Sequence, residues 1–354
     1  MSAERELLET SLTELLTDRC TPEVVAAADG SWDPGLWSHL DRAGLTAVGV
    51  PEEAGGSGGG LLDAALVARC CAAFAAPVPI APTLLVAPWL REAAGLAHRP
   101  GPAAVAGTAA VTAARDAGGW VLAGYARRVA WGRCAESVLV LVGTPEGLAL
   151  ADVADGAVEP AADAAGEPSD TVVFDGVRVP DERVRPVTTR LLTALRMRQA
   201  LATTVMLAGA LDTVLDLTRR YAGERVQFGR PISAFQLVKR QVAQLAGEVA
   251  VAGAAADAAV REVAAAPADG DPLPAVLAAR VRAARSATAA TAIAHQVHGA
   301  IGFTREHRLQ HFTRRLWTWR DAHDGEGALQ EELGRLLAER GGDRLWTTVT
   351  RAGV

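Results

Sequence analysis

Residues 221–236 are YAGERVQFGRPISAFQ, and they interrupt a part of the chain that otherwise follows a helical pattern. Apolar residues recur at helical spacing at about 188–222 and 232–266, on either side of this stretch. Glycine and proline within it favour a turn, because proline lacks the amide hydrogen that a helix needs. Further helical segments at about 275–299, 306–320 and 327–340 predict a helical bundle, and the stretch is expected to connect its first two helices.

The side chains of this stretch suit a dinucleotide. Arg225 offers a fork of hydrogen-bond donors to a pyrophosphate, and Gln227 and Gln236 carry amides that can bond phosphate or ribose oxygens. Phe228 and Phe235 offer apolar surface to an adenine ring. The alternative is that Arg225 is a helix-end cap and Gln236 a surface amide.

A second stretch, residues 296–307, is QVHGAIGFTREH. Gln296 can also bond phosphate or ribose oxygens. Gly299 and Gly302 allow a ligand to approach the backbone closely, since glycine has no Cβ, and Ala300 lies between them. Both stretches therefore carry residues that suit a dinucleotide.

The pattern along the chain predicts an α+β class that is mainly helical. Residues 1–100 are expected to form an N-terminal helical domain, and residues 187–354 a C-terminal helical bundle. Between them, in residues 101–186, short apolar runs alternate with turn residues, which predicts an antiparallel β-domain. Asp116 to Gly119 and Asp175-Gly176 are the expected hairpin turns within it.

The two stretches resemble signature motifs of the acyl-CoA dehydrogenase family, E-R-x-Q-F-G-x-P-I-x-x-F-Q and Q-x-x-G-G-x-G-F-T, with Ala300 replacing the second glycine of the latter. PEEAGGS at 51–57 and VVFDGVRVP at 172–180 also resemble family positions. The resemblance implies a helical N-terminal domain, a middle β-barrel and a C-terminal four-helix bundle. It further implies FAD as cofactor, an acyl thioester as substrate, an electron-transfer acceptor, and a dimer or tetramer of like or unlike chains.

The middle domain departs from the family pattern. Family members contact the flavin ring with a T-E-P-x-x-G-S-D loop and a later W-I-T segment. The chain instead has a shortened VAGTAAVTAARD at 105–116 and RRVAWGR at 127–133.

The catalytic base is also displaced. The family removes the α-proton of the acyl group with a carboxylate while hydride passes from Cβ to the flavin. An ungapped count places His323 at the usual glutamate position and Gln199 at the position that a smaller group of members uses. Asp324 or Glu326 is then the candidate base, and the alternative is that either one begins the next helix as an N-cap or first-turn charge.

In the family, one chain supplies the middle domain and the base, and its neighbour supplies the Arg, Phe and Gln of the two retained motifs. The chain therefore resembles the donating half of a divided, hetero-oligomeric enzyme. Two alternatives remain open: a self-sufficient homo-oligomer that uses Asp324 or Glu326, and a scaffold that has lost redox chemistry.

Composition excludes several other classes. The net charge of −6 and the lack of a basic run argue against a nucleic-acid partner. Apolar runs are too short to predict a membrane span, and the four cysteines without C-x-x-C spacing favour a reducing cytoplasm. The pairs His295/His298 and His307/His311 have helical spacing but no further ligand nearby, so no metal is expected.

Overall fold

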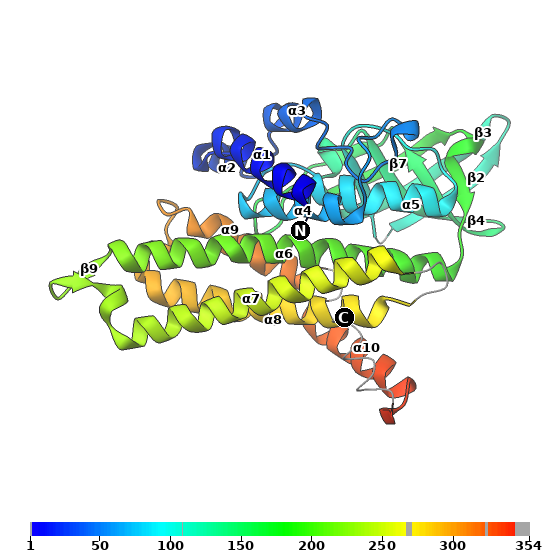
Figure 1. Cartoon of the computed structure of the whole chain (residues 1–354). Coiled ribbons are helices and arrows are strands. Elements are labelled where there is room, and N and C mark those ends of the chain that lie inside the picture. The colour runs from blue at the N-terminus through cyan, green and yellow to red at the C-terminus, as the bar shows by residue number, and fades with distance from the viewer. Residues whose placement is uncertain (1, 108, 267–270, 323–324, 344–354) are drawn as a thin grey trace. The chain divides into compact units, whose positions relative to one another are not determined.

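The computed structural model describes residues 2–107, 109–266, 271–322 and 325–343. The chain forms two compact units, which we call the helix unit (residues 1–22, 68–76 and 203–354) and the sheet unit (residues 23–67 and 77–202). Long helices with a sheet in the middle of the sequence confirm the predicted α+β, mainly helical class (Figure 1). The boundaries predicted at residues 100 and 186 remain a prediction.

The sheet unit contains eight described strands in one sheet, in the order β6-β7-β3-β2-β4-β5-β8, with β1 paired to β4. Their bounds are β1 Ala103–Ala106, β2 Ala109–Asp116, β3 Gly119–Ala130, β4 Ser137–Thr144, β5 Gly147–Val153, β6 Ala157–Glu159, β7 Ser169–Val179 and β8 Val184–Pro186. The strict antiparallel prediction is wrong in one respect. β4 runs parallel to β1 over four residues and to β2 at one point, so the sheet is mixed. A two-residue connection places β1 and β2 on the same side of β4.

One of the two expected hairpin turns is confirmed. Asp116 pairs with Gly119 at the turn between β2 and β3. The turn expected at Asp175-Gly176 is wrong, because β7 continues through both residues. The register with β3 shifts by one residue there, and Gly176 has a φ of +67°, so this dipeptide forms a β-bulge.

Alternate residues of the strands point into one core, as the period of two requires. Val140 and Val142 of β4, Leu122 of β3 and Phe174 of β7 are buried in it. Helix α5 (Ala87–Ala94) is fixed to the sheet by the buried Arg91, whose guanidinium bonds the Asp152 carboxylate at 2.8 Å and the Ser137 hydroxyl at 2.6 Å. Other helices of this unit are α2 (Pro22–Ala27) and α3 (Pro34–Arg42).

Two helices pass through both units, α4 (Leu61–Ala73) and α6 (Thr189–Glu224). At 36 residues, α6 is about 54 Å long. Its length and apolar composition match those of a membrane span, but 67% of its most apolar window is buried inside the protein. A core helix satisfies the same criterion, so this helix is weak evidence for a membrane.

The helix unit is formed largely by the C-terminal helices. These are α7 (Gln236–Ala265), α8 (Leu273–His298), α9 (Leu309–Asp321) and α10 (Gly325–Glu339), together with α1 (Ala3–Arg19) and the second part of α6. The predicted helical segments are all present. Helix α9 begins later than predicted, at Leu309, so His307 and His311 do not share a helix.

Small residues allow α7 and α8 to pack closely. Ala252 and Ala256 of α7 and Ala283, Ala287 and Ala290 of α8 are buried at helical spacing. The short connection between Ala265 and Leu273 makes the two packed helices antiparallel. The C-terminal end of α8 is therefore at the same end of the unit as the beginning of α7.

Candidate functional site

The first motif forms a hairpin between α6 and α7. Strands β9 (Val226–Gln227) and β10 (Arg230–Pro231) pair antiparallel, with Gln227 opposite Arg230. Phe228 and Gly229 form the two-residue turn, and their φ angles of +52° and +78° fit a type I′ hairpin. Such a φ is common for glycine and rare for phenylalanine, so Phe228 is held in a strained conformation.

The hairpin displays its side chains to solvent, and in Figure 1 it projects beyond the ends of α6 and α7. Phe228 is 92% exposed. Its ring contacts that of Phe235 edge to face, with ring centres 6.0 Å apart. The Arg230 guanidinium lies 4.4 Å from the centre of the Phe235 ring. Arg225, Gln227 and Gln236 are exposed as well. The donors and aromatic faces predicted to meet a cofactor are thus open to a ligand or another chain.

The second motif forms the end of α8 and a 3₁₀ turn, η6 (Gly299–Phe303). Gln296, Gly299 and Ala300 are exposed, whereas Gly302 is buried. A Cβ on Gly302 would lie 2.9 Å from the Cβ of His298, so a larger residue does not fit without a shift. Gly299 has a φ of +64°, which ends α8 and turns the chain.

Aromatic contacts join the two motifs. Tyr221, four residues before Arg225, stacks on His298, two residues after Gln296, with ring centres 4.5 Å apart. His307 contacts His298 edge to face at 4.8 Å. Nδ1–H of His298 donates to the Ala294 carbonyl at 2.8 Å, and burial lowers the pKa of His298 to about 4. The imidazole is therefore neutral at pH 7, and the cluster fixes both motif segments at one end of the helix unit.

These residues fit one part of FAD. Exposed Arg225, Gln227, Gln236 and Gln296 are suitable donors for a diphosphate and its ribose, and Phe228 with Phe235 offers apolar faces to a base. Ala300 replaces a motif glycine but is exposed, so its methyl group has room. The site lacks a described residue set for the flavin ring.

The structure of the sheet unit explains why residues for the flavin ring are lacking among the described ones. Only Gly107 and Thr108 separate β1 from β2, where the family pattern has a flavin-binding loop; Thr108 is outside the described residues. In the later segment, Trp131 is buried with a φ of +63°. Arg133 bonds the buried Asp170 carboxylate through its Nε at 3.0 Å. The side chains of this segment thus pack inside the sheet unit and form an ion pair within it.

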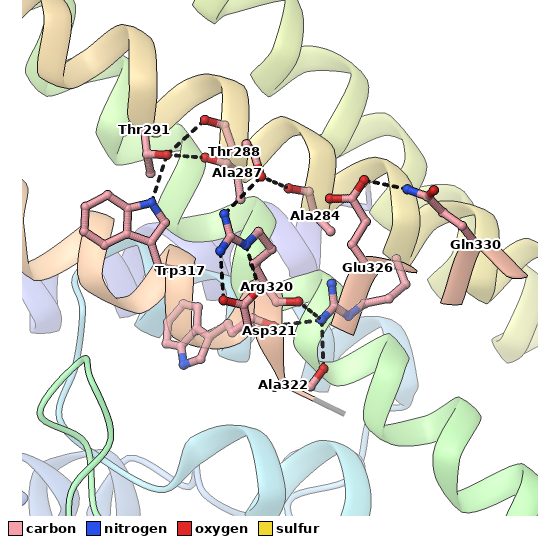
Figure 2. Close-up of polar contacts among 12 residues, drawn as sticks. Ala284, Ala287, Thr288, Thr291, Trp317, Arg320, Asp321, Ala322, Glu326 and Gln330 are labelled. Atoms are coloured by element: carbon pink, nitrogen blue, oxygen red, sulfur yellow. Dashed lines mark hydrogen bonds and ion pairs between the residues drawn. The ribbon is translucent and has the colours of Figure 1, made fainter. Parts of the chain in front are cut away.

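Of the two candidate bases, Asp324 lies outside the described residues, as does His323. Glu326 is in the first turn of α10 and is half-buried. Its Oε1 accepts a hydrogen bond from the Gln330 amide at 2.5 Å, as Figure 2 shows, and lies 3.3 Å from Arg285 Nε. Gln199, the other position considered, is buried in the sheet unit next to Gly107.

The end of α9, next to these candidates, is held by a buried arginine. Arg280 of α8 is 0% exposed, and its Nη2 donates to the carbonyls of Trp319, Arg320 and Ala322 at 2.8–3.2 Å. Burial lowers its pKa to about 10. Arg320 pairs with Asp321 on the surface and reaches the Thr288 hydroxyl at 3.3 Å (Figure 2).

Sequence reasoning missed a pocket in the helix unit. Its volume is about 370 Å³, and it is lined by His295, Gly302, Phe303, Arg305, Gln310, Thr313, Arg314 and Trp317. Trp317 of α9 is one of its lining residues. His295 gave no usable signal, because a histidine at a helical spacing from another histidine resembles a core residue.

Comparison with known proteins identifies the family. Residues 2–94 match the family described as acyl-CoA dehydrogenase, N-terminal domain, and residues 189–320 match its C-terminal domain. The chain is 32% identical to acyl-CoA dehydrogenase IpdE2 of Mycolicibacterium smegmatis, over 96% of this chain and 99% of that protein.

Solved structures support the same family assignment. One chain of the ChsE4-ChsE5 complex from Mycobacterium tuberculosis superposes on this chain with a TM-score of 0.87 and 25% sequence identity. The match covers 96% of this chain and 98% of that one. A variant of the Tcur3481-Tcur3483 steroid ACAD gives 0.82 at 25% identity, over 95% and 98%. The chain therefore belongs to the acyl-CoA dehydrogenase family of FAD-dependent oxidoreductases that act on CH–CH bonds.

Proposed function

We propose that this chain is a subunit of a hetero-oligomeric acyl-CoA dehydrogenase and donates FAD contacts across a subunit interface during α,β-desaturation of an acyl thioester. One observation carries the proposal. The motif residues are displayed on an exposed hairpin with Phe228 at its tip, whereas the chain's own β1–β2 connection has only two residues.

The exposed hairpin is best explained by a neighbour that covers it. An exposed phenylalanine in a strained turn costs stability and gains little from packing within the chain. Val226 and Leu237 flank it and are also exposed. Removing these apolar side chains from water against a second chain offsets that cost.

Arg225, Gln227, Gln236 and Gln296 would hold the diphosphate and ribose of FAD, and Phe228 and Phe235 would pack against its adenine. When bound, FAD supplies the acceptor for the hydride that leaves Cβ of the acyl group. The partner chain would supply the flavin-ring contacts and the carboxylate that takes the α-proton. The reduced cofactor requires an electron-transfer acceptor in turn.

The described part of this chain offers no alternative base in a suitable setting. The Glu326 carboxylate accepts a hydrogen bond from Gln330 and pairs with Arg285. Glu326 therefore fits the first-turn role better than the catalytic one. Asp324 remains a candidate for a homo-oligomeric enzyme.

Two similar structures are each named for two different proteins, ChsE4-ChsE5 and Tcur3481-Tcur3483. They support a partner of unlike sequence for this chain too. Tcur3481-Tcur3483 is a steroid ACAD, so bulky steroid acyl thioesters belong in the substrate panel beside straight-chain ones. A CoA thioester substrate and the buried free thiols of all four cysteines fit the cytoplasm.

The test compares the protein purified alone with the protein co-expressed with a second acyl-CoA dehydrogenase chain. We expect almost no FAD in the isolated protein, and FAD with desaturation of the panel in the complex, measured by absorption and by flavin release on denaturation. Arg225→Gln in this chain should lower the FAD content of the complex. The matched control is Arg335→Gln on α10, an exposed arginine that pairs with Glu339.

Two outcomes contradict the proposal. About one FAD per chain in the isolated protein would show a self-sufficient enzyme and direct attention to Asp324. No FAD in any complex that assembles would show a scaffold without redox chemistry.

A further inference from the structure

We propose that the hairpin end of the helix unit, residues 224–240, is a docking surface for an acidic surface on the unlike subunit, and that its positive charge steers the two chains together. This rests on the proposed function, because it names the chemistry of the chain that would cover the hairpin. Residues 224–240 show three features that carry it: their net charge, the lack of ion pairs, and their place beside the proposed cofactor contacts.

Residues 224–240 are basic within an acidic chain. They contain Arg225, Arg230, Lys239 and Arg240 against one carboxylate, Glu224, which gives a net charge of +3. The whole chain has a net charge of −6, so the remainder of the chain carries −9. This end of the helix unit therefore has the opposite sign to the chain as a whole.

The four cations are not neutralised by the part of the chain that the structure describes. All four are exposed, and no described carboxylate forms an ion pair with any of them. Earlier on α6 the arrangement differs, since Arg219 and Arg220 both pair with Asp216. Exposed charges without a countercharge remain available to an oppositely charged surface.

Two of the cations lie one helical turn beyond proposed cofactor contacts. The Lys239 amide donates to the Phe235 carbonyl at 3.0 Å, so these two residues are one turn apart. Arg240 follows Gln236 by the same interval on α7. On the hairpin, the Arg230 guanidinium lies 4.4 Å from the centre of the Phe235 ring. The cations therefore lie beside the residues proposed to hold FAD, where the chain that holds the flavin ring would approach.

Helix α7 itself gains nothing from Lys239 and Arg240. Its first turn contains no acidic residue, and these two are the first charged residues of the helix. The N-terminus of a helix carries partial positive charge, so acidic side chains would stabilise this end better than basic ones. A partner thus explains the two cations better than the fold of this chain does.

A protein surface fits this end better than a small anion. The exposed apolar side chains of Val226, Phe228 and Leu237 are interspersed with the cations. An apolar centre bordered by polar and charged residues is typical of a protein–protein interface. The FAD diphosphate would engage Arg225, which leaves the remaining cations for carboxylates of the unlike subunit.

The test mixes the full-length chain with the separately purified second chain in the presence of FAD and measures the association and dissociation rates. We expect the association rate to fall at least about tenfold between about 50 mM and about 500 mM salt, because salt screens the attraction between the two surfaces. The dissociation rate should change much less, since charges at the border of an interface act mainly on association.

A double charge reversal separates steering from folding. Lys239→Glu/Arg240→Glu should associate at least about tenfold more slowly at low salt and lose most of the salt dependence. Its Tm should be unchanged or higher, because acidic residues suit this end of α7. The FAD content of the complex, once formed, should be unchanged. The matched control is Arg261→Glu/Arg335→Glu, near the end of α7 and on α10, which makes the same change in net charge and should associate at the original rate.

The outcomes distinguish this inference from the proposed function. A complex that contains FAD but associates at a rate independent of salt, or equally fast with the Lys239→Glu/Arg240→Glu chain, would overturn the inference and leave the proposed function standing. If the second chain forms no complex, both are overturned. Self-association of the isolated chain that the double variant abolishes would also overturn the inference, since a second copy would then be the acidic partner.

Discussion

Tyr221 stacks on His298 with ring centres 4.5 Å apart and an interplanar angle of 20°. The contact joins residues 77 positions apart in the sequence, at the ends of α6 and α8. Tyr221 belongs to the first stretch and His298 to the second, and both stretches were predicted to bind the same cofactor. One stacked pair therefore sets the relative position of two groups of cofactor contacts.

Tyr221→Ala should disturb both motifs at once. Loss of the ring and its stack should lower the free energy of unfolding by about 2 kcal/mol, as for other partly buried aromatic residues. The FAD content of the co-expressed complex should fall as well. Tyr221→Phe keeps the stack and serves as the control, and an equal loss in both variants would show that the hydroxyl, not the ring, is important.

His298 should make the protein sensitive to acid. Burial lowers its pKa from 6.5 to about 4, so the folded state resists protonation that the unfolded state accepts. Above pH 6.5 neither state binds the proton and stability is unaffected. Stability is lost as pH falls from 6.5 to 4, by at most about 3 kcal/mol from this residue.

Denaturant unfolding across that pH range measures the effect, with His298→Phe as the comparison. The variant should show a shallower loss on acidification. The pKa values of His295 and His307 are also lowered by burial, so part of the loss should persist in it. A variant as steep as the original protein would refute the assignment to His298.

Phe228→Asn should separate stability from function. Asparagine tolerates the positive φ of this turn, and the exposed ring contributes little packing, so the variant should gain up to about 1 kcal/mol. The FAD content of the complex should nevertheless decrease, since the aromatic face is lost. Thermal unfolding and flavin release measure the two effects, and a variant that is less stable would show that the ring packs within the chain.

Asp152→Asn should destabilise the sheet unit. Asp152 is 2% exposed and accepts from Arg91 at 2.8 Å and from Arg99 at 2.9 Å. Removing its charge leaves the buried Arg91 guanidinium without a countercharge, which costs about 3–5 kcal/mol. Asp181→Asn, in an exposed pair with Arg115, is the matched control and should change stability by less than about 1 kcal/mol.

The helical period of the sequence was sufficient to predict most of the fold. The helices on either side of the hairpin agree with the predicted segments to within a few residues at their ends. They could be predicted because buried residues repeat at helical spacing along one face of each helix. Gly176 shows where local rules fail. Asp-Gly is a strong turn signal, but pairing of β7 with β3 on both sides of it makes a bulge more stable than a turn.

The candidate site was predicted only where residues are close in sequence. Arg225, Phe228 and Gln236 belong to one continuous motif, and their exposure agrees with a ligand-contacting role. The pocket around His295 depends on α9 returning beside α8, which brings Trp317 and Arg314 to a residue 19 or more positions earlier. No pattern along the chain contains that information.

The exposed tip of the hairpin has a consequence for the life of the protein in a cell. Phe228, Val226 and Leu237 form apolar surface on a chain that has not yet met a partner. Chaperones and proteases recognise such surface, and association removes it by mass action. If the proposed unlike subunit covers this surface, synthesis of the two chains in matched amounts would determine how long each copy survives.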